Sequence, residues 1–184
     1  MTKNWEKEYA SRDLKDIIPP AELLKNYRSL FSKGKALDIA SGTGHNAVFL
    51  SSAGYDVTAI DQSVAATRLA NAFASKKKCP VHTVAQDILR YSIAPESFDL
   101  IADFYFLERT IIPDIKNGLT PGGLIFFETY TVDQQDIDGP HNPDFLLKPN
   151  ELLDWFKDFF IIFYHERTEE KKAVASLVAR KIAS

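Results

Sequence analysis

A glycine-rich turn directly after a short apolar run is the part of this sequence best suited to bind a ligand. Residues 36–47 read ALDIASGTGHNA, with Gly42 and Gly44 in the turn and a helical pattern starting at once. A buried strand that leads through such a turn into a helix N-terminus binds nucleotides, because glycine lets the backbone approach the ligand closely. Asp38 lies inside the apolar run, where a buried carboxylate costs free energy unless it has a partner. We therefore expect Asp38 to face a donor group of a ligand.

Three further predicted strands also have an acidic residue at or just past their carboxyl end. These residues are Asp61, Asp87 and Asp103. In open α/β sheets, ligands bind at these strand ends. Asp61 comes 19 residues after Gly42, which is the spacing at which a carboxylate accepts hydrogen bonds from ribose hydroxyls.

The roles of the other acidic residues follow from their chemistry. Asp87 could accept from the exocyclic amine of adenine, with Ile88 against the ring, or it could cap a short helix. Asp38 and Asp103 are suited to hold an ammonium group, although Asp103 can also be read as a turn residue.

Two kinds of cofactor satisfy this outline. The stretch Gly42–Ala47 matches the Gly-x-Gly-x-x-Gly/Ala pattern of dinucleotide-binding proteins such as those that use NAD. S-adenosylmethionine would instead require an acidic residue in the strand before Gly-x-Gly. Asp38 discriminates between them, because its charge would repel a pyrophosphate at the helix N-terminus and attract an ammonium group. The pattern therefore favours S-adenosylmethionine.

The elements that position these residues alternate between strands and helices. Strands are predicted at 36–40, 55–60, 80–85, 98–102 and 124–128, and helices at 21–31, 46–53, 64–77, 111–119 and 149–156. Such alternation implies an α/β fold with a parallel sheet and helices on both faces. Residues 120–123 are predicted to form a turn, 131–148 a long loop, and the runs 159–165 and 173–181 an antiparallel pair at one edge.

Composition limits the class of protein. The 184 residues fit one domain, and the formal net charge of −3 speaks against a large nucleic-acid footprint. The single cysteine, Cys79, excludes an internal disulfide and fits a reducing compartment. The polar start of the chain does not look like a signal peptide, and no apolar run is long enough to cross a membrane. We expect a cytoplasmic protein without a membrane or nucleic-acid partner.

These motifs, in this order, resemble those of class I S-adenosylmethionine-dependent methyltransferases. The stretches that carry the resemblance are ALDIASGTGH, VTAIDQS, AQDIL, FDLIADFYFLER and LTPGGLIFFETY. The small size and the stretches FYFLER and VASLVARK are most similar to compact bacterial methyltransferases of the tellurite-resistance type. The resemblance implies a Rossmann-like, doubly wound, seven-stranded and mostly parallel sheet in strand order 3-2-1-4-5-7-6, with an antiparallel last strand.

The resemblance also implies a function. The whole chain would be one methyltransferase domain, with residues 1–34 as an N-terminal helical or lid segment and 35–184 as the cofactor-binding core. It would transfer a methyl group from S-adenosylmethionine to a small molecule by in-line displacement and release S-adenosylhomocysteine. The alternative is a non-catalytic protein of the same fold that binds the cofactor, and a small NAD-binding protein is a third possibility. The cofactor residues implied are Asp38, Ala40, Gly42, Gly44, Asp61, Gln62, Asp87, Ile88 and Asp103.

The sequence identifies the acceptor side less clearly. Tyr105, Arg109, Tyr130 and Phe145 follow the fourth and fifth strands and are our candidates to line an acceptor pocket, although Arg109 is more readily explained by an ion pair. His141 and Tyr105 are the candidates for a base. The segment from Asp103 departs from the Asn/Asp-Pro-Pro-Tyr of enzymes that methylate amino groups of bases or glutamine, which argues against such substrates.

Three further expectations concern metal binding, the oligomeric state and the aromatic residues near the start of the chain. No cluster of His and Cys has metal-ligand spacing, so no metal is expected. The protein would be a monomer or a homodimer. Trp5 and Tyr9, spaced i and i+4, could belong to a lid over the ligand or to a helix packed on the sheet.

Overall fold

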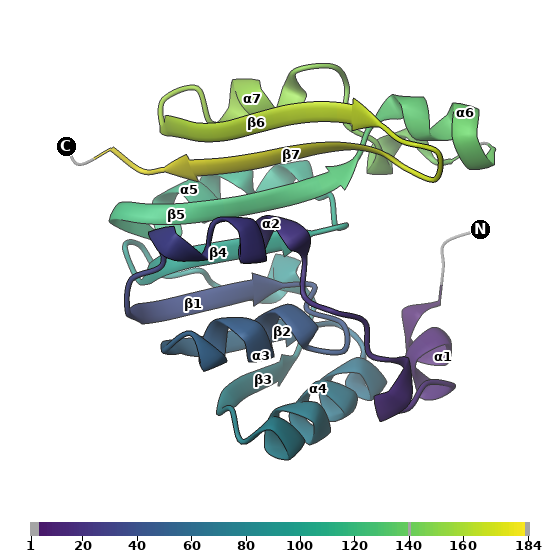
Figure 1. The fold of residues 1–184 in the computed structure, drawn as a ribbon, viewed down its shortest axis with the longest axis vertical. Coiled ribbons are helices and arrows are strands. Elements are labelled where there is room, and N and C mark those ends of the chain that lie inside the picture. Colours follow the sequence, from purple (N-terminus) through teal and green to yellow (C-terminus); the bar gives the residue numbers. More distant parts are fainter. Residues whose placement is uncertain (1–3, 140, 183–184) are drawn as a thin grey trace. The chain divides into compact units, whose positions relative to one another are not determined.

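The computed structural model describes residues 4–139 and 141–182, and Figure 1 shows the path of the chain. The chain divides into two compact units, one up to Ser92 and one from Ile93. Each unit contains several strands of the sheet with its own helices, and each is described separately below.

The N-terminal unit contains three strands. Its elements are α1 (Trp5–Ala10), η1 (Leu14–Asp16), α2 (Glu22–Asn26), η2 (Arg28–Leu30), β1 (Gly34–Ile39), α3 (His45–Ser52), β2 (Tyr55–Asp61), α4 (Val64–Lys77), β3 (Val81–Ala85) and η3 (Ile88–Arg90), where η denotes a 3-10 helix. β2 pairs in parallel with β1 on one side and with β3 on the other. α3 packs on β1 and β2, and α4 packs on β2 and β3. The predicted strands and the helices after Gly44 and Ser63 are confirmed.

The helix predicted over residues 21–31 is interrupted. α2 ends at Asn26, and a 3-10 turn follows in which the N–H groups of Leu30 and Phe31 bond to the carbonyl groups of Tyr27 and Arg28. The Phe31 ring lies 6.2 Å from that of Phe49 and 5.7 Å from that of Tyr55, measured between centroids. Packing of this aromatic ring on the core therefore outweighs the helical periodicity of the segment.

The C-terminal unit contains the other four strands. Its elements are β4 (Phe98–Phe104), η4 (Arg109–Ile111), α5 (Ile112–Gly118), β5 (Leu119–Tyr130), η5 (Val132–Gln134), α6 (Gln135–Asp138), η6 (Pro143–Phe145), α7 (Glu151–Trp155), β6 (Phe160–Thr168) and β7 (Ala173–Arg180). β4 and β5 are parallel, whereas β7 runs antiparallel to both β5 and β6. The predicted antiparallel pair at the end of the chain is confirmed.

Residues 120–123 do not form a separate turn, so this prediction was wrong. They belong to the first part of the long strand β5, where the register with β4 shifts between Phe98 and Leu100. The N–H of Gly122 bonds to the carbonyl of Lys181 over 2.9 Å, and the N–H of Lys181 bonds to the carbonyl of Gly123 over 2.9 Å. This pairing with the chain after β7 holds the two glycines within the bulged first part of β5, where Gly122 has a left-handed φ of 80°.

Residues 131–148 are more structured than a loop. They contain η5, α6 and η6, and their ends are joined by a bridge between Thr131 and Leu147. The N–H of Val132 bonds to the carbonyl of Leu147, and the N–H of Leu147 bonds to the carbonyl of Tyr130. The segment therefore leaves and returns at the end of β5.

The strand order of the sheet is β3-β2-β1-β4-β5-β7-β6. This is the predicted seven-stranded α/β arrangement with an antiparallel β7, and the fold prediction is confirmed. Over residues 4–139 and 141–182, no helix combines the length and apolar character that a membrane span requires.

Candidate functional site

The turn after β1 is held in a left-handed backbone conformation. Ala40, Gly42 and Gly44 have φ values of 49°, 52° and 76°. The N–H of Ser41 bonds to the carbonyl of Ile60 at the end of β2, and the N–H of Gly44 bonds back to the carbonyl of Ser41, each over 2.9 Å. The turn is therefore fastened to the neighbouring strand just before α3 begins.

Gly44 is required by packing as well as by its backbone angle. A Cβ atom at this position would lie 2.7 Å from the Cβ atom of Ala70 and 3.1 Å from its Cα atom, both on α4. Real side chains do not approach a backbone atom so closely without displacing it, so the glycine allows α4 to pack directly on the turn. Gly42 is also covered, because a Cβ atom there would lie 2.7 Å from the hydroxyl of Tyr9.

Asp61 at the end of β2 is bonded to this turn. Its Oδ2 atom accepts from the N–H of Gly42 and its Oδ1 atom from the N–H of Ser63, each over 2.8 Å. Burial raises the pKa of Asp61, the two backbone hydrogen bonds lower it, and the charge of Glu6 raises it, with a net increase. Each carboxylate oxygen has a second lone pair. Asp61 is thus fixed in position and still able to accept from two hydroxyl groups of a ligand.

Asp38 and Ser41 each keep a buried polar atom without a hydrogen-bond partner. Asp38 is 1% exposed and Ser41 is 5% exposed. The Oδ2 atom of Asp38 and the Oγ atom of Ser41 have no partner, although the Asp38 carboxyl receives a hydrogen bond from the N–H of Ala47. Burial raises the pKa of Asp38 to about 8, with a further contribution from the charge of Asp61. Buried polar groups in folded proteins are nearly always satisfied, so these two atoms are suited to bond a polar group of a ligand.

The charge of this site selects the ligand. Asp38 and Asp61 lie at the same turn, and an ionised carboxylate at either position raises the free energy of an anion placed there. A pyrophosphate would meet two carboxyl groups, whereas an ammonium group would relieve the buried Asp38. The arrangement fits a cofactor with ribose hydroxyls and an ammonium group, and the contacts of Asp38 and Asp61 with such a cofactor stay predictions.

The remaining cofactor candidates of the N-terminal unit lie at the ends of its three strands. Asp87 accepts from the N–H of Leu89 over 3.1 Å and so caps η3, which is the structural role considered for it. Ile88 is buried, Gln62 is exposed directly after Asp61, and Ala40 is the last residue before the turn. Contacts of Ala40, Gln62, Asp87 and Ile88 with a cofactor stay predictions.

Asp103 belongs to the C-terminal unit and is buried inside β4, opposite Phe127 of β5. It is not a turn residue, so that alternative was wrong. β4 continues two residues beyond the predicted end, because Asp103 and Phe104 stay in register with β5.

Tyr105, directly after β4, is held in a strained position. Its φ of 59° is unusual for an aromatic residue, and its N–H bonds to the carbonyl of Glu128 over 2.8 Å. Its hydroxyl donates to the Glu128 Oε1 atom over 2.7 Å and accepts from Lys172 Nζ over 3.3 Å. Its ring lies 5.1 Å from that of Tyr130. Burial and the Glu128 hydrogen bond raise the pKa of Tyr105, so the phenol is neutral at physiological pH.

Glu128 is the centre of this group. Its Oε2 atom accepts from Ser176 Oγ over 2.6 Å and from Arg167 Nη2 over 3.1 Å, and Lys172 Nζ lies 3.7 Å from Oε1. Burial raises the pKa of Glu128, but the hydrogen bonds from Ser176 and Tyr105 and the two cations outweigh burial and lower it. Glu128 is therefore a buried, ionised carboxylate.

Sequence reasoning missed Glu128, Arg167, Lys172 and Ser176. Glu128 stands in the apolar run LIFFE, as Asp38 stands in ALDIA, and the same argument would have identified it. Arg167 and Lys172 lie in the charged stretch 166–172 between the last two apolar runs, where the sequence gives no sign of a contact with Glu128.

The other acceptor candidates lie near the 131–148 segment. The Arg109 guanidinium pairs with both carboxylate oxygens of Glu151 (Nε–Oε1 2.7 Å, Nη2–Oε2 3.0 Å) and donates to the carbonyls of Asp144 and Leu146. The interpretation of Arg109 as an ion-pair residue is therefore supported. His141 Nε2 lies 2.6 Å from the Asp138 carboxylate on an exposed surface, and Phe145 is 52% exposed.

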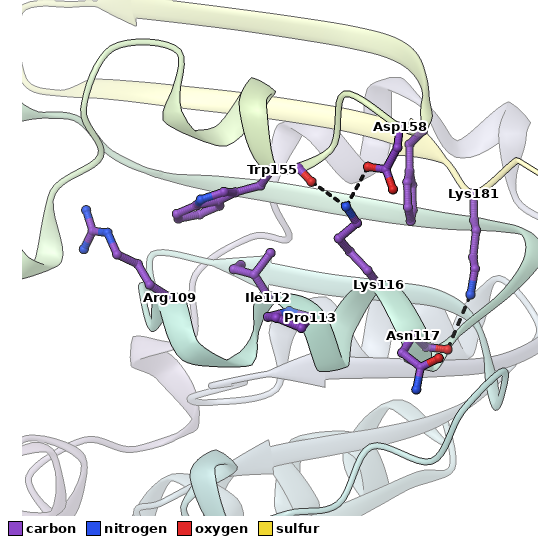
Figure 2. A pocket seen from close by; sticks show the side chains of 9 residues that line it. Arg109, Ile112, Pro113, Lys116, Asn117, Trp155, Asp158 and Lys181 are labelled. Carbon is purple, nitrogen blue, oxygen red and sulfur yellow. Dashed lines mark hydrogen bonds and ion pairs between the residues drawn. The ribbon is translucent and has the colours of Figure 1, made fainter.

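A pocket of about 630 Å³ lies beside α5 in the C-terminal unit. Figure 2 shows that its cations are engaged by the protein: Lys116 donates to the Trp155 carbonyl and the Asp158 carboxylate, and Lys181 donates to the Asn117 carbonyl. Arg109 is the predicted site residue that contributes to its wall. The pocket thus shows no unsatisfied group that would identify a ligand.

Within residues 4–139 and 141–182, no three side chains of His, Cys, Asp or Glu gather into a group that could hold a metal ion.

Comparison with known proteins agrees with the fold. The crystal structure of TehB from Haemophilus influenzae superposes with a TM-score of 0.74 at 26% identity and covers 97% of this chain and 67% of that one. A curated protein of the same species (strain KW20), "Probable S-adenosyl-L-methionine-dependent methyltransferase TehB", is 29% identical over 184 aligned residues, 90% of this chain and 61% of that protein. "Hemagglutinin 1" of Eikenella corrodens is 35% identical over 141 residues, 72% of this chain and 46% of that protein.

The chain thus spans about half to three fifths of the length of these two curated relatives. The sequence profile described as "Tellurite resistance protein TehB" matches residues 6–176, nearly the whole chain. With its class I methyltransferase strand order, the chain belongs to the TehB family.

Proposed function

We propose that this chain is an S-adenosylmethionine-dependent methyltransferase that acts on a small-molecule acceptor. The main support for this proposal is a pair of buried polar atoms without a hydrogen-bond partner at the glycine turn, Asp38 Oδ2 and Ser41 Oγ. They lie beside a second carboxylate, Asp61, at a turn whose charge disfavours a pyrophosphate. Relatives described as probable S-adenosylmethionine-dependent methyltransferases support the same assignment.

The residues of the N-terminal unit would bind and orient the cofactor. Asp61 would accept hydrogen bonds from the ribose hydroxyls with the lone pairs that Gly42 and Ser63 leave open. Asp38 would hold the ammonium group, and Asp87 and Ile88 would contact the adenine. When bound, S-adenosylmethionine supplies a methyl group already activated on a sulfonium, so the protein has mainly to position the reactants and exclude water. Positioning of this kind can lower a barrier by roughly 7–11 kcal/mol.

The acceptor-side residues of the C-terminal unit are Tyr105, Tyr130 and Phe145. Tyr105 is the most constrained of them, because its hydroxyl donates a hydrogen bond to Glu128 and accepts one from Lys172. The neutral phenol of Tyr105, fixed in this way, can orient a polar methyl acceptor, but it is too weak a base to remove a proton from an amine or alcohol. A thiol or selenol has a more acidic proton and needs no strong base, so an acceptor of this kind suits the arrangement.

The first test is isothermal titration calorimetry with S-adenosylhomocysteine and with NAD. We expect saturable heat with S-adenosylhomocysteine and none with NAD, and the reverse result would reject the proposal. The second test is release of S-adenosylhomocysteine from S-adenosylmethionine in the presence of thiol, selenite, tellurite and amine acceptors. If the protein binds S-adenosylhomocysteine but none of the four acceptor classes is methylated, the alternative of a non-catalytic binding protein is favoured.

Three parts of the prediction wait for experiment: a cytoplasmic location, a monomeric or homodimeric state, and the absence of a nucleic-acid partner. Size-exclusion chromatography with light scattering settles the second, and the buffer salt should be stated because charge interactions depend on it.

A further inference from the structure

Glu6 of the N-terminal helix α1 is hydrogen-bonded to the start of α4. The Glu6 Oε2 atom accepts from the Ser63 hydroxyl over 2.7 Å and from the N–H of Ala65 over 3.2 Å. Ser63 in turn caps α4, because its Oγ atom accepts from the N–H of Ala66 over 3.0 Å. The Glu6 carboxylate thus lies at the positive end of a 14-residue helix, where an anion is favoured.

The same helix places Tyr9 over the glycine turn. The Tyr9 hydroxyl packs on Gly42, whose N–H is bonded to Asp61. Burial and the charge of Asp61 raise the pKa of Tyr9 to about 12. One face of the Tyr9 ring is stacked on Trp5, with centroids 5.9 Å apart, and the Arg12 guanidinium lies 5.3 Å from the ring centre. The aromatic pair therefore reaches the ribose-binding carboxylate of the proposed site.

The attachment of α1 is weak enough to be reversible. The helix has six residues, none of them buried, and an isolated helix of this length is not stable in water. Its closure rests on Glu6 and Tyr9. After the helix, the chain is fixed again at Ala21, whose N–H donates to the Asn46 side chain on α3 over 2.9 Å. Residues 11–20, which include Pro19 and Pro20, can therefore act as the connection about which α1 moves.

We propose that α1 is a lid on the cofactor site, with Glu6 as its latch on α4 and Tyr9 as the residue that closes over the bound nucleoside. This inference rests on the proposed function. Cofactor exchange requires α1 to open, and a ligand bound at Asp61 stabilises the closed position by making contact with the Tyr9 side chain. The measured affinity for the cofactor is then the affinity of the closed form multiplied by the fraction of molecules in which α1 is closed.

Trp5 supplies a direct signal for this motion. The chain has two tryptophans, and a Trp155→Phe background leaves Trp5 as the single emitter. We expect addition of S-adenosylhomocysteine to shift Trp5 emission with the same dissociation constant that calorimetry gives. We also expect slower amide hydrogen exchange in residues 5–10, measured in the unsubstituted protein so that the result does not depend on the Trp155 variant.

Substitution of the latch tests the mechanism. Glu6→Gln should weaken binding of S-adenosylhomocysteine roughly threefold to tenfold and speed exchange in α1, since it removes a charge-assisted hydrogen bond. Glu22→Gln is the matched control, because Glu22 also lies exposed in the first turn of a helix but pairs with Lys25.

The outcomes separate the two proposals. If the unsubstituted protein does not bind S-adenosylhomocysteine, the proposed function fails. If it binds but Trp5 emission and exchange in α1 are unchanged, the lid is wrong and the function stands. Faster exchange on binding would also overturn the lid, because α1 would then occupy the place of the ligand and be displaced.

Discussion

The N–H of Gly42 donates to the carboxylate of Asp61 over 2.8 Å, so the residue predicted to bind ribose also fixes the glycine turn. The second oxygen of Asp61 accepts from the N–H of Ser63 at the start of α4. One carboxylate therefore joins the end of β2, the turn after β1 and the first turn of α4. Changes at Asp61 should alter both the order of the turn and the binding of a ligand.

Asp61→Asn should lower the affinity for S-adenosylhomocysteine by about 10- to 100-fold. The amide keeps one acceptor oxygen for the backbone but loses the charge that strengthens hydrogen bonds to the ribose, each worth about 1.5–3 kcal/mol. Isothermal titration calorimetry measures the loss. Asp56→Asn is the control, since Asp56 is an exposed carboxylate on the same strand that pairs with His82. An equal loss in both variants would show that Asp61 does not contact the ligand.

Binding of S-adenosylhomocysteine at pH 7 should release about one proton from Asp38. In the free protein the pKa of Asp38 is raised to about 8, so the carboxyl is mostly protonated at pH 7. A bound ammonium group favours the carboxylate and lowers this pKa, which requires release of the proton. The affinity should therefore rise as the pH increases from 6 to about 8.

Calorimetry in buffers of different ionisation enthalpy measures the released proton. In the Asp38→Asn variant the buffer dependence should disappear, and the affinity should be lower and nearly independent of pH over the same range. Proton release that persists in this variant would assign the proton to another group and contradict the role of Asp38.

Gly44→Ala should destabilise the protein more than Gly122→Ala. Both glycines have a left-handed backbone, with φ of 76° and 80°. A Cβ atom at Gly122 meets nothing within 4 Å, whereas one at Gly44 meets Ala70 at 2.7 Å. We expect a loss of about 1–2 kcal/mol from backbone strain at each site, and a further loss of about 1–3 kcal/mol from overpacking at Gly44. Urea unfolding midpoints test the difference. Equal losses would show that α4 shifts to make room for the added Cβ atom without lowering the free energy of unfolding.

The elements around Gly44 could be predicted because local signals and tertiary contacts agree there. Ser63 caps α4 as expected, and Asp38, Gly42 and Asp61 lie at one turn. The predictions failed where distant contacts decide the conformation. Pairing with the chain after β7 holds Gly122 and Gly123 within β5, and packing of Phe31 interrupts the first long helix.

The Glu128 group was hidden for a similar reason. Its members come from β5, β6, the β6–β7 connection and β7, and no spacing in the sequence brings them together. The isolated carboxylate in an apolar strand was the available signal. Tyr105 was identified from its place after β4. Its hydrogen-bond partner Glu128, which helps to keep the phenol neutral, lies 23 residues later in the sequence and could not be paired with it from spacing.

Arg109→Ala should loosen the segment that contains η6. The guanidinium joins η4 to Glu151 and to the carbonyls of residues 144 and 146, so its loss removes a donor from each of these three groups. We expect faster cleavage within residues 139–148 in limited proteolysis and a loss of about 1–2 kcal/mol of stability. Arg90→Ala, a substitution of an exposed arginine in η3, should leave both measurements unchanged. Normal resistance to proteolysis in Arg109→Ala would show that other contacts hold the segment.

Glu128→Gln should destabilise the protein by about 1–3 kcal/mol at pH 7, because Arg167 and Lys172 lose their shared counter-charge. The pKa of Glu128 is lowered in the folded state, so its stabilising effect is complete above the normal pKa of 4.5 and is lost as the pH falls through the folded value. The difference in unfolding free energy between the two proteins should therefore shrink below pH 4.5. Urea unfolding from pH 7 to pH 3 measures this difference. Tyr105→Phe, which removes one hydrogen bond but keeps the charges, should shift the pH at which the effect disappears upward. A difference that stays constant with pH would show that Glu128 is not ionised in the folded protein.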